Sequence, residues 1–366
     1  MKILLLGAAG FIGAHMTERL LGSGKHEVVG FDIETEKVDE MRGEPKFRFV
    51  QGDLREEDES VQQMVRESDL VVDLIAHANP SLYVLRPLDV FHLNFVENLK
   101  IAEWCVKENR RLIQFSTCEV YGKTVASVAR DYLKNPDDPM HAHFVEDETN
   151  FILGPVTKHR WIYACAKQLL ERVLHAMGLK YGLNWCVIRP FNYIGPKIDY
   201  LPHEEDGNPR VFSHFMTALL TGRQMPLVDG GRHKRCYTYI RDAIDCIEKI
   251  VEDPEASRQQ IFNIGSPYNE VSIHDMAYLM RDIFEEKFAG PDYKRPEIVD
   301  VPSKEFYGEG YEDSDRRIPD ITKAQTLLGW EPKIDLATTC ELSMKYYVDR
   351  HREQQGDGPK VVRDAD

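Results

Sequence analysis

The sequence predicts an α/β fold that combines a doubly wound parallel sheet with a smaller C-terminal α/β lobe. Two observations in the first half of the chain support the sheet. Short apolar segments alternate with amphipathic helical patterns, and a glycine-rich turn joins the first apolar segment to the helix after it. After Pro190 this alternation ends and glycine and proline become frequent, which indicates a second, smaller lobe.

Each predicted strand of the sheet is a short apolar segment bounded by turn residues. The expected strands cover residues 2–6, 27–32, 47–50, 70–76, 111–116 and 185–189. Helical periodicity over 90–109 and 161–181 predicts two long amphipathic helices between them. Because strands alternate with helices at this spacing, the strands should lie parallel in one sheet.

Three further elements are expected outside this series. The segment that ends at Asn263-Ile264-Gly265 predicts another strand, and Ser272 is expected to cap a helix over 272–285. The polar connection over 122–150 is long enough to predict a functional loop.

Composition excludes several classes of protein. The 366-residue chain has a formal net charge of −15, which argues against a general role in binding nucleic acid. Its apolar runs are too short and too interrupted by charge to predict a membrane span. The seven cysteines are odd in number and never spaced as Cys-x-x-Cys, which predicts neither a disulfide framework nor a metal site and indicates the reducing cytoplasm.

The first glycine-rich turn predicts a dinucleotide site. Residues 7–13 read Gly-Ala-Ala-Gly-Phe-Ile-Gly between a strand and a helix, a pattern that brings a pyrophosphate close to a helix N-terminus. On its own the motif could be a packed turn. Asp32, however, ends the next strand, where a carboxylate binds ribose hydroxyls and repels a 2′-phosphate, so NAD is predicted over NADP. The predicted cofactor-binding residues are Gly7, Gly10, Phe11, Ile12, Gly13, Asp32, Asp53 and Leu54, together with Tyr163 and Lys167 described below.

This site defines the expected domains. A NAD-binding Rossmann domain should cover residues 1–187, and 236–262 should return to it. A substrate-binding lobe should be formed by 188–235 and 263–350. The polar residues 351–366 should form a flexible tail.

A tyrosine and a lysine predict the chemistry. Tyr163 and Lys167 are four residues apart, so they share one face of the predicted helix. We expect the lysine ammonium to lower the pKa of the phenol and make it a usable base. Thr117, at the end of a strand, can share the proton. These residues predict removal of a proton from a sugar hydroxyl while its carbon loses a hydride to a nicotinamide.

With these motifs in place, the chain resembles the extended short-chain dehydrogenases/reductases that act on nucleotide sugars, over residues 1–350. Within them it is similar to enzymes that act on UDP-glucuronic acid, namely the decarboxylase half of the bacterial polymyxin-resistance enzyme and, more nearly, the plant-type UDP-apiose/UDP-xylose synthases. The stretches that carry the resemblance are 111–123, 160–168, 189–196, 228–231 and 303–319. The resemblance implies NAD-dependent oxidative decarboxylation of UDP-glucuronic acid through a UDP-4-keto intermediate, giving UDP-apiose, UDP-xylose or both.

The resemblance also implies roles for individual residues. Tyr163 would be the base, with Lys167 and Thr117 as its partners. Glu119 and Cys118 would assist the chemistry. The residues expected to contact the substrate are Arg160, Asn192, Arg210, Lys234, Arg235, Tyr307 and Arg317, of which Arg317 also counts as catalytic. The same resemblance implies a homodimer formed through the two long helices.

Two positions refine this reading. Apiose synthases carry a second active-site cysteine where this chain has Ala78, so efficient contraction of the sugar ring is in question while decarboxylation is not. Hexose 4,6-dehydratases carry an aspartate where this chain has Cys118, which argues against dehydration.

Alternatives stay open for several residues and for the function. Cys118 could be a small buried side chain, Arg317 could belong to a solvated charge cluster with Asp313, and Lys234 and Arg235 could be surface charges. Other functions are release of UDP-4-keto-pentose, 4-epimerisation of a UDP-sugar, and a catalytically silent NAD-binding regulator.

Overall fold

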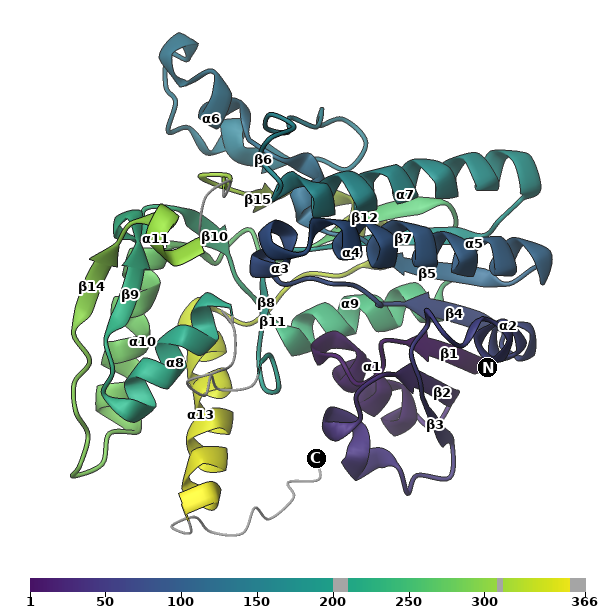
Figure 1. Cartoon of the computed structure of the whole chain (residues 1–366), viewed down its shortest axis with the longest axis horizontal. Helices are drawn as coiled ribbons and strands as arrows, with labels where there is room; N and C mark the ends of the chain where they lie inside the picture. Colours follow the sequence, from purple (N-terminus) through teal and green to yellow (C-terminus); the bar gives the residue numbers. More distant parts are fainter. Residues whose placement is uncertain (200–209, 308–311, 356–366) are drawn as a thin grey trace.

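The computed structural model describes residues 1–199, 210–307 and 312–355. Its centre is a seven-stranded sheet in the order β12-β7-β5-β4-β1-β2-β3, in which all paired strands run parallel (Figure 1). The strands of this sheet are β1 (Lys2–Leu6), β2 (Glu27–Asp32), β3 (Phe47–Gln51), β4 (Leu70–Asp73), β5 (Arg111–Phe115), β7 (Trp185–Pro190) and β12 (Gln260–Ile264). The predicted doubly wound parallel sheet is confirmed.

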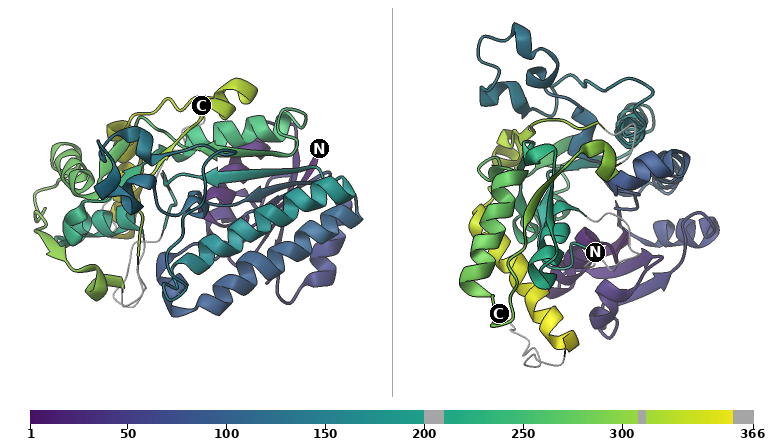
Figure 2. Two further views of the ribbon diagram at one scale, coloured as in Figure 1. Left: turned by 90° about the horizontal axis from the view of Figure 1, so that it is seen from above. Right: turned by 60° about the vertical axis from the view of Figure 1, so that its left-hand side comes forward.

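Helices cover both faces of the sheet (Figure 1). On one face lie α1 (Phe11–Gly22) and α9 (Ile240–Glu252), and on the other lie α2 (Asp58–Glu67), α5 (Asn98–Lys107) and α7 (Trp161–Tyr181). Residues 3–6 of β1 are all apolar because successive side chains enter opposite cores. Ile3 and Leu5 pack with α1 and α9, whereas Leu4 and Leu6 pack with the other helices. The left view of Figure 2 shows α5 and α7 side by side along the sheet.

The strand expected over 70–76 ends at Asp73, three residues early. The N–H of Leu74 still donates to the carbonyl of Leu6 in β1 at 2.9 Å, but the backbone of Ile75 bonds to side chains instead of to a neighbouring strand. The N–H of Ile75 donates to Asp73 Oδ1 at 3.0 Å, and its carbonyl accepts from Asn98 Nδ2 at 3.2 Å. The chain thereby leaves the sheet toward the cavity described below, which Leu74, Ala76 and Ala78 line.

The helix expected over 90–109 is helical but not uniform. It consists of α4 (Pro87–Phe91), a π-helical segment over His92–Glu97 and α5. In that segment the side chain of Asn94 turns inward, where its Oδ1 accepts from the N–H of His77 at 2.9 Å and its Nδ2 donates to the carbonyl of His77 at 3.1 Å. These bonds are long-range, so the local pattern carried no sign of them. The helix over 161–181 matches the prediction.

A smaller group of elements lies beside one end of the sheet (Figure 1). The paired strands here are β8 (Tyr193–Ile194) with β11 (Thr238–Tyr239), β9 (Met225–Val228) with β14 (Ile298–Val301), β10 (Lys234–Cys236) with β13 (Glu270–Ser272), and β6 (His143–Phe144) with β15 (Ile318–Pro319). The remaining α-helices are α3 (Pro80–Leu85), α6 (Val125–Val128), α8 (Val211–Thr221), α10 (Ile273–Lys287), α11 (Ser303–Tyr307), α12 (Thr322–Leu328) and α13 (Leu336–Gln355). Short 3₁₀ turns cover Glu36–Met41, Cys118–Tyr121, Arg130–Tyr132, Pro139–Ala142 and Asp229–Gly231.

Several expectations about this half can be compared with the structure. Within the segment over 236–262, α9 packs on α1 and β12 pairs with β7 of the large sheet, whereas β11 pairs with β8. The side chain of Ser272 caps α10 by accepting the N–H of Asp275 at 2.9 Å, as predicted. The last helix runs to Gln355, so residues 351–355 of the expected tail are helical, and 356–366 lie outside the described residues. The domain boundaries themselves stay a prediction.

In the described part of the chain, no helix has both the length and the apolar character needed to cross a bilayer.

Candidate active site

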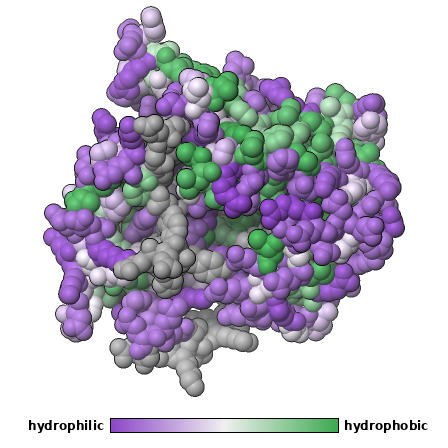
Figure 3. Space-filling view, in the orientation of Figure 1, coloured by the Kyte–Doolittle hydropathy of each residue, from purple (hydrophilic) through white to green (hydrophobic). Residues whose placement is uncertain are grey.

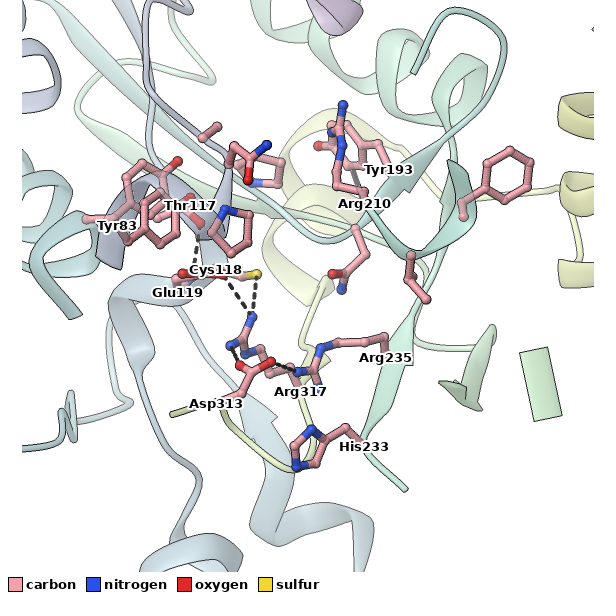
Figure 4. Close-up of a pocket in the computed structure, with 18 of the residues that line it drawn as sticks. Tyr83, Thr117, Cys118, Glu119, Tyr193, Arg210, His233, Arg235, Asp313 and Arg317 are labelled. Carbon is pink, nitrogen blue, oxygen red and sulfur yellow. Dashed lines mark hydrogen bonds and ion pairs between the residues drawn. The ribbon is translucent and has the colours of Figure 1, made fainter. Parts of the chain in front are cut away.

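A cavity of about 480 Å³ opens where the carboxyl ends of the sheet strands meet the smaller group of elements (Figure 4). Thr117 and Cys118, which follow β5, line its sheet side, and Tyr163 enters from α7. Arg235 of β10 and Arg317 line it from the other side. The carboxyl edge of an open parallel sheet is the usual place for a ligand in this class of fold.

The glycine-rich turn has the geometry that a dinucleotide needs. Gly7 has a φ of +84°, and a Cβ at Gly13 would lie 2.1 Å from the carbonyl oxygen of Gly7. Asp32 ends β2, and its carboxylate accepts the N–H groups of Ala9 at 2.8 Å and Glu34 at 3.1 Å. Burial raises the pKa of Asp32, although these backbone donors oppose the shift. The turn therefore presents bare backbone at the start of α1 and a carboxylate beside it, which fits NAD.

The other predicted cofactor residues are placed differently. Phe11 and Ile12 line the cavity at the start of α1. Asp53 lies outside the cavity and is held by Arg55 through a 2.5 Å ion pair, which lowers the pKa of its carboxyl group. Leu54 is buried in the core under β3.

Tyr163, Lys167 and Thr117 come together at the start of α7. The ring of Tyr163 is stacked on the ring of Tyr83, with centroids 4.5 Å apart. The hydroxyl groups of Thr117 and Tyr83 are hydrogen-bond partners of the Tyr163 hydroxyl. Lys167 is buried and its Nζ donates to Asn98 Oδ1 at 2.9 Å.

The expected effect of Lys167 on the pKa of Tyr163 is wrong in this structure. Burial raises the pKa of Tyr163, and the negative charge of Glu119 raises it further, while the hydrogen bonds to Thr117 and Tyr83 oppose the shift. Burial also lowers the pKa of Lys167, to about 8. Desolvation of both groups outweighs their proximity along the helix, so the phenol is neutral at rest.

Three arginines meet two carboxylates beside Cys118, and Figure 4 shows two of them, Arg235 and Arg317. We call Glu119, Arg160, Arg235, Asp313 and Arg317 the Asp313 cluster. Asp313 binds all three guanidinium groups, at 2.8 Å from Arg160, 2.6 Å from Arg235 and 2.6 Å from Arg317. Glu119 binds Arg160 through two hydrogen bonds of 2.6 and 3.0 Å. Three positive and two negative charges leave the cluster with one net positive charge, which suits an anionic ligand.

Burial makes the Asp313 cluster electrostatically strong. Arg160 and Arg317 are 1% and 2% exposed. Although burial alone would raise it, Arg235, Arg160 and Arg317 hold the pKa of Asp313 well below its usual range. Arg317 is therefore not part of a solvated charge cluster. Its Nε is buried without a hydrogen-bond partner among the described residues.

Cys118 lies against this cluster. Its sulfur is 4.0 Å from Nη1 of Arg317, and the side chain is buried at the cavity wall. Burial raises the pKa of the Cys118 thiol, although Arg317 opposes the shift. The thiol is therefore protonated at neutral pH and can act as a proton donor.

The remaining predicted substrate residues divide into two groups. Asn192 lines the cavity with a φ of 42°, and Arg210 lines it while bound to Asp199 at 2.6 Å. Lys234 is exposed and does not line the cavity, because side chains alternate along β10 and Arg235 takes the inward position. Tyr307 is the last residue of α11, and its side chain lies outside what the structure describes.

Two residues at the site escaped prediction. Tyr83 lies in α3, whose N-cap Asn79 accepts the N–H of Ser81 with its side chain. The sequence contained this N-cap signal, but it did not indicate that Tyr83 stacks on Tyr163. Asp313 lies next to Glu312, whose carboxylate binds Lys123 at 2.6 Å and thereby ties this segment to the 122–150 connection. Because Asp313 has charged neighbours in the sequence, this segment resembled a solvated cluster of surface charges.

Comparisons with known proteins place the chain in a family. The model of the NAD dependent epimerase/dehydratase family matches residues 3–265. The chain is 40% identical to UDP-D-apiose/UDP-D-xylose synthase 1 of Arabidopsis thaliana, over 94% of this chain and 91% of that protein. It is 38% identical to UDP-D-apiose/UDP-D-xylose synthase of Oryza sativa subsp. japonica, over 96% and 90%.

Solved structures agree with this assignment. The PbgP3 protein from Burkholderia pseudomallei is 32% identical and superposes with a TM-score of 0.82, over 98% of this chain and 99% of that one. UDP-glucuronic acid 4-epimerase from Bacillus cereus, solved with UDP-glucuronic acid and NAD, has the same fold, with a TM-score of 0.77 at 21% identity over 96% and 100%. This protein belongs to the NAD dependent epimerase/dehydratase family.

Proposed function

We propose that this protein catalyses the NAD-dependent oxidative decarboxylation of UDP-glucuronic acid through a UDP-4-keto intermediate, giving UDP-apiose, UDP-xylose or both. One observation carries the proposal: the net positive Asp313 cluster lies in the same cavity as Tyr163 and Cys118, in a chain whose overall charge is −15. A buried arginine cluster beside the catalytic tyrosine suits a sugar that carries a carboxylate. The names of the plant relatives support the same reaction.

The reaction needs a 4-ketone before the carboxylate can leave. Oxidation at C4 makes the C5 carboxylate part of a β-keto acid, so the electrons of the breaking C–C bond can enter an enolate. Bound NAD would supply the hydride acceptor for this oxidation and the donor for a later reduction.

The residues of the chain would handle the protons and the charge. Tyr163, once deprotonated, would take the proton from the C4 hydroxyl, and the Thr117 hydroxyl would share it. Lys167 would stabilise the phenolate from the next helical turn. Arg317, which lines the cavity, would bind the sugar carboxylate and release it as the charge moves to the ring.

The nucleotide would lie toward the smaller group of elements. Asn192, Arg210 and Arg235 line that side of the cavity, and we propose that they hold the UDP portion. Lys234 lies outside the lining, so its predicted contact, like that of Tyr307, stays a prediction.

The proposal is tested by incubating the purified protein with UDP-glucuronic acid and NAD, while carbon dioxide, NADH absorbance and the sugar product by NMR are followed together. Carbon dioxide with UDP-apiose or UDP-xylose is the expected result. Carbon dioxide with accumulating NADH would instead identify an enzyme that releases UDP-4-keto-pentose. A 4-epimer without carbon dioxide would overturn the decarboxylase assignment.

The product ratio is expected to depend on Cys118 and Ala78, which both line the cavity. Contraction of the ring needs a group that donates a proton to the opened sugar and takes one back. The buried Cys118 thiol is such a group. We expect Cys118→Ser to lower UDP-apiose formation by about 10²-fold, as loss of a general acid does, and to change carbon dioxide release only a few-fold. Ala78→Cys should raise the share of UDP-apiose. Quantitative NMR of both products, with total carbon dioxide as the internal control, checks this; equal losses of both outputs would contradict it.

We also propose a homodimer formed through the α5 and α7 face. Figure 3 shows apolar side chains gathered over this side of the molecule. Among the exposed apolar residues are Leu88 of α4 at 70% and Leu169 of α7 at 45% exposure. An exposed apolar surface of this kind is typical of an interface between subunits. Sedimentation equilibrium should give the mass of a dimer, and Leu169→Glu should shift it toward the monomer, whereas Leu327→Glu on α12, whose side chain is 43% exposed, should leave the dimer intact.

A further inference from the structure

Asp73 is a buried carboxylate that the mechanism above does not use. It ends β4, has no exposed surface and does not line the cavity. Gln114 Nε2 donates to its Oδ2 at 2.9 Å, and the N–H of Ile75 donates to its Oδ1 at 3.0 Å. None of the basic side chains that the structure describes forms an ion pair with it. A buried carboxylate without an ion pair is costly, so its presence calls for a reason.

Lys167 is the matching positive charge. It is 1% exposed, and its Nζ donates to the neutral side chain of Asn98. Two carboxylates act on it electrostatically, Asp73 more strongly than Glu171. Glu171 already has a counter-ion, because Arg189 binds it through two hydrogen bonds of 3.0 and 2.6 Å. Asp73 is therefore the uncompensated anion that favours the ammonium form of Lys167.

A chain of hydrogen bonds joins the two groups. Lys167 Nζ donates to Asn98 Oδ1 at 2.9 Å, and Asn98 Nδ2 donates to the carbonyl of Ile75 at 3.2 Å. The N–H of Ile75 then donates to Asp73 at 3.0 Å. Three elements, α7, α5 and the end of β4, are thus connected beneath the cavity.

We propose that Asp73 is a positioning residue for the reaction, which holds Lys167 in place and in its cationic form through its charge and through the Asn98–Ile75 link. The proposal rests on the proposed function in one respect, that Lys167 serves the chemistry at Tyr163. The proposal gives a role in the reaction to a residue in the core of the sheet that does not contact the substrate.

The direction of the effect on pH dependence follows from the charges. Burial lowers the pKa of Lys167 to about 8 and raises the pKa of Asp73 to about 6, so both groups are charged between these values. The other polar groups that face Asp73 are the neutral amide of Gln114 and the Cys105 thiol, whose pKa burial raises. Without the Asp73 charge, the pKa of Lys167 falls, and the ammonium is lost at a lower pH.

Asp73→Asn is the direct test, because the fold can accept it. The new amide would face Gln114, whose Oε1 is buried without a partner among the described residues, so a flip of the Gln114 amide would restore a hydrogen bond. In the kcat–pH profile, we expect the alkaline limb to move down by about one pH unit, the smaller end of the effect of a nearby charge. KM for UDP-glucuronic acid should change little because Asp73 does not line the cavity.

Asp242→Asn is the matched control. Asp242 is also a buried carboxylate, and it accepts two backbone N–H groups, from Lys333 and Ile334, at 2.9 Å each. It does not line the cavity, so this variant should lower Tm without moving the pH profile. An unshifted profile in Asp73→Asn would overturn the proposal.

A double-mutant cycle tests the coupling without activity. Lys167→Met leaves Asp73 as a lone buried charge, so adding Asp73→Asn should raise the urea midpoint of that variant at pH 7.5, whereas Asp73→Asn alone should lower the wild-type midpoint. Additive effects of the two substitutions would overturn the proposal. If Asp73→Asn alone fails to fold, the comparison of Lys167→Met with the double variant still tests the coupling, because a double variant no more stable than Lys167→Met would overturn the proposal. This comparison is independent of whether UDP-glucuronic acid is the substrate.

Discussion

Tyr163→Phe is expected to lower turnover of UDP-glucuronic acid by about 10²–10⁴-fold, the range that a positioned acid–base group contributes. The substitution removes only the hydroxyl that would take the C4 proton. The ring should stay stacked on Tyr83, 4.5 Å away between centroids, so the fold and the cavity should be preserved. Release of carbon dioxide under saturating substrate gives kcat, and calorimetry should show that NAD and UDP bind as in the wild type.

The matched comparison is Tyr83→Phe. This variant keeps the stacked pair but removes a hydroxyl that lowers the pKa of Tyr163. We expect a loss of no more than about 10-fold, since a single neutral hydrogen bond is worth about 1 kcal/mol. Turnover by Tyr163→Phe within 10-fold of the wild type, with correct folding, would show that another group takes the proton.

Asp313→Asn is expected to destabilise the fold by about 3–5 kcal/mol, as removal of one partner from a buried ion pair does. The substitution removes the one charge, among the residues that the structure describes, that binds all three guanidinium groups of the Asp313 cluster. It raises the net charge of the cluster from one to two. Binding of the sugar carboxylate should suffer as well, because Arg160, Arg235 and Arg317 lose their common anchor. Urea unfolding measures the first effect, and KM for UDP-glucuronic acid the second.

The pH dependence of this loss has a defined sign. The folded-state pKa of Asp313 is depressed, so its stabilising contribution is fully present above the unfolded-state value of about 3.9 and disappears as pH falls through the folded-state value. The stability difference between wild type and variant should therefore be constant from neutral pH to about pH 5 and shrink only in stronger acid.

Asp315→Asn is the control for the same substitution two residues away. The Asp315 side chain is 64% exposed and pairs with His233 at 3.4 Å, so its loss should cost no more than about 1 kcal/mol. Equal effects of the two variants would mean that the Asp313 cluster contributes no special stability.

Much of the fold could be predicted because its signals are local. Apolar segments at the right spacing placed β1, β2 and α7 to the residue, and the glycines with Asp32 placed the NAD-binding turn. These features depend on the residue types within one or two turns or strands, which the sequence records directly.

Other features depend on groups that meet only in the folded chain. The π-helical segment before α5 follows from the bonds between Asn94 and His77, 17 residues apart. Arg235, not Lys234, enters the cavity because of the register of β10 against β13. Neither the π-helical segment nor the inward position of Arg235 can be predicted from the local spacing of apolar residues.

The site also combines features that the sequence predicts with features that only the folded chain decides. The residue types and spacing of Thr117, Tyr163 and Lys167 determined the kind of chemistry, because hydrogen-bonding and charged groups have fixed intrinsic properties. Only the tertiary structure decided their pKa values, since burial raises the pKa of Tyr163 and lowers that of Lys167 to about 8. Burial also makes Asp313, which lies in a polar stretch of the sequence, the common counter-ion of three arginines. An ion pair becomes stronger as its surroundings exclude solvent.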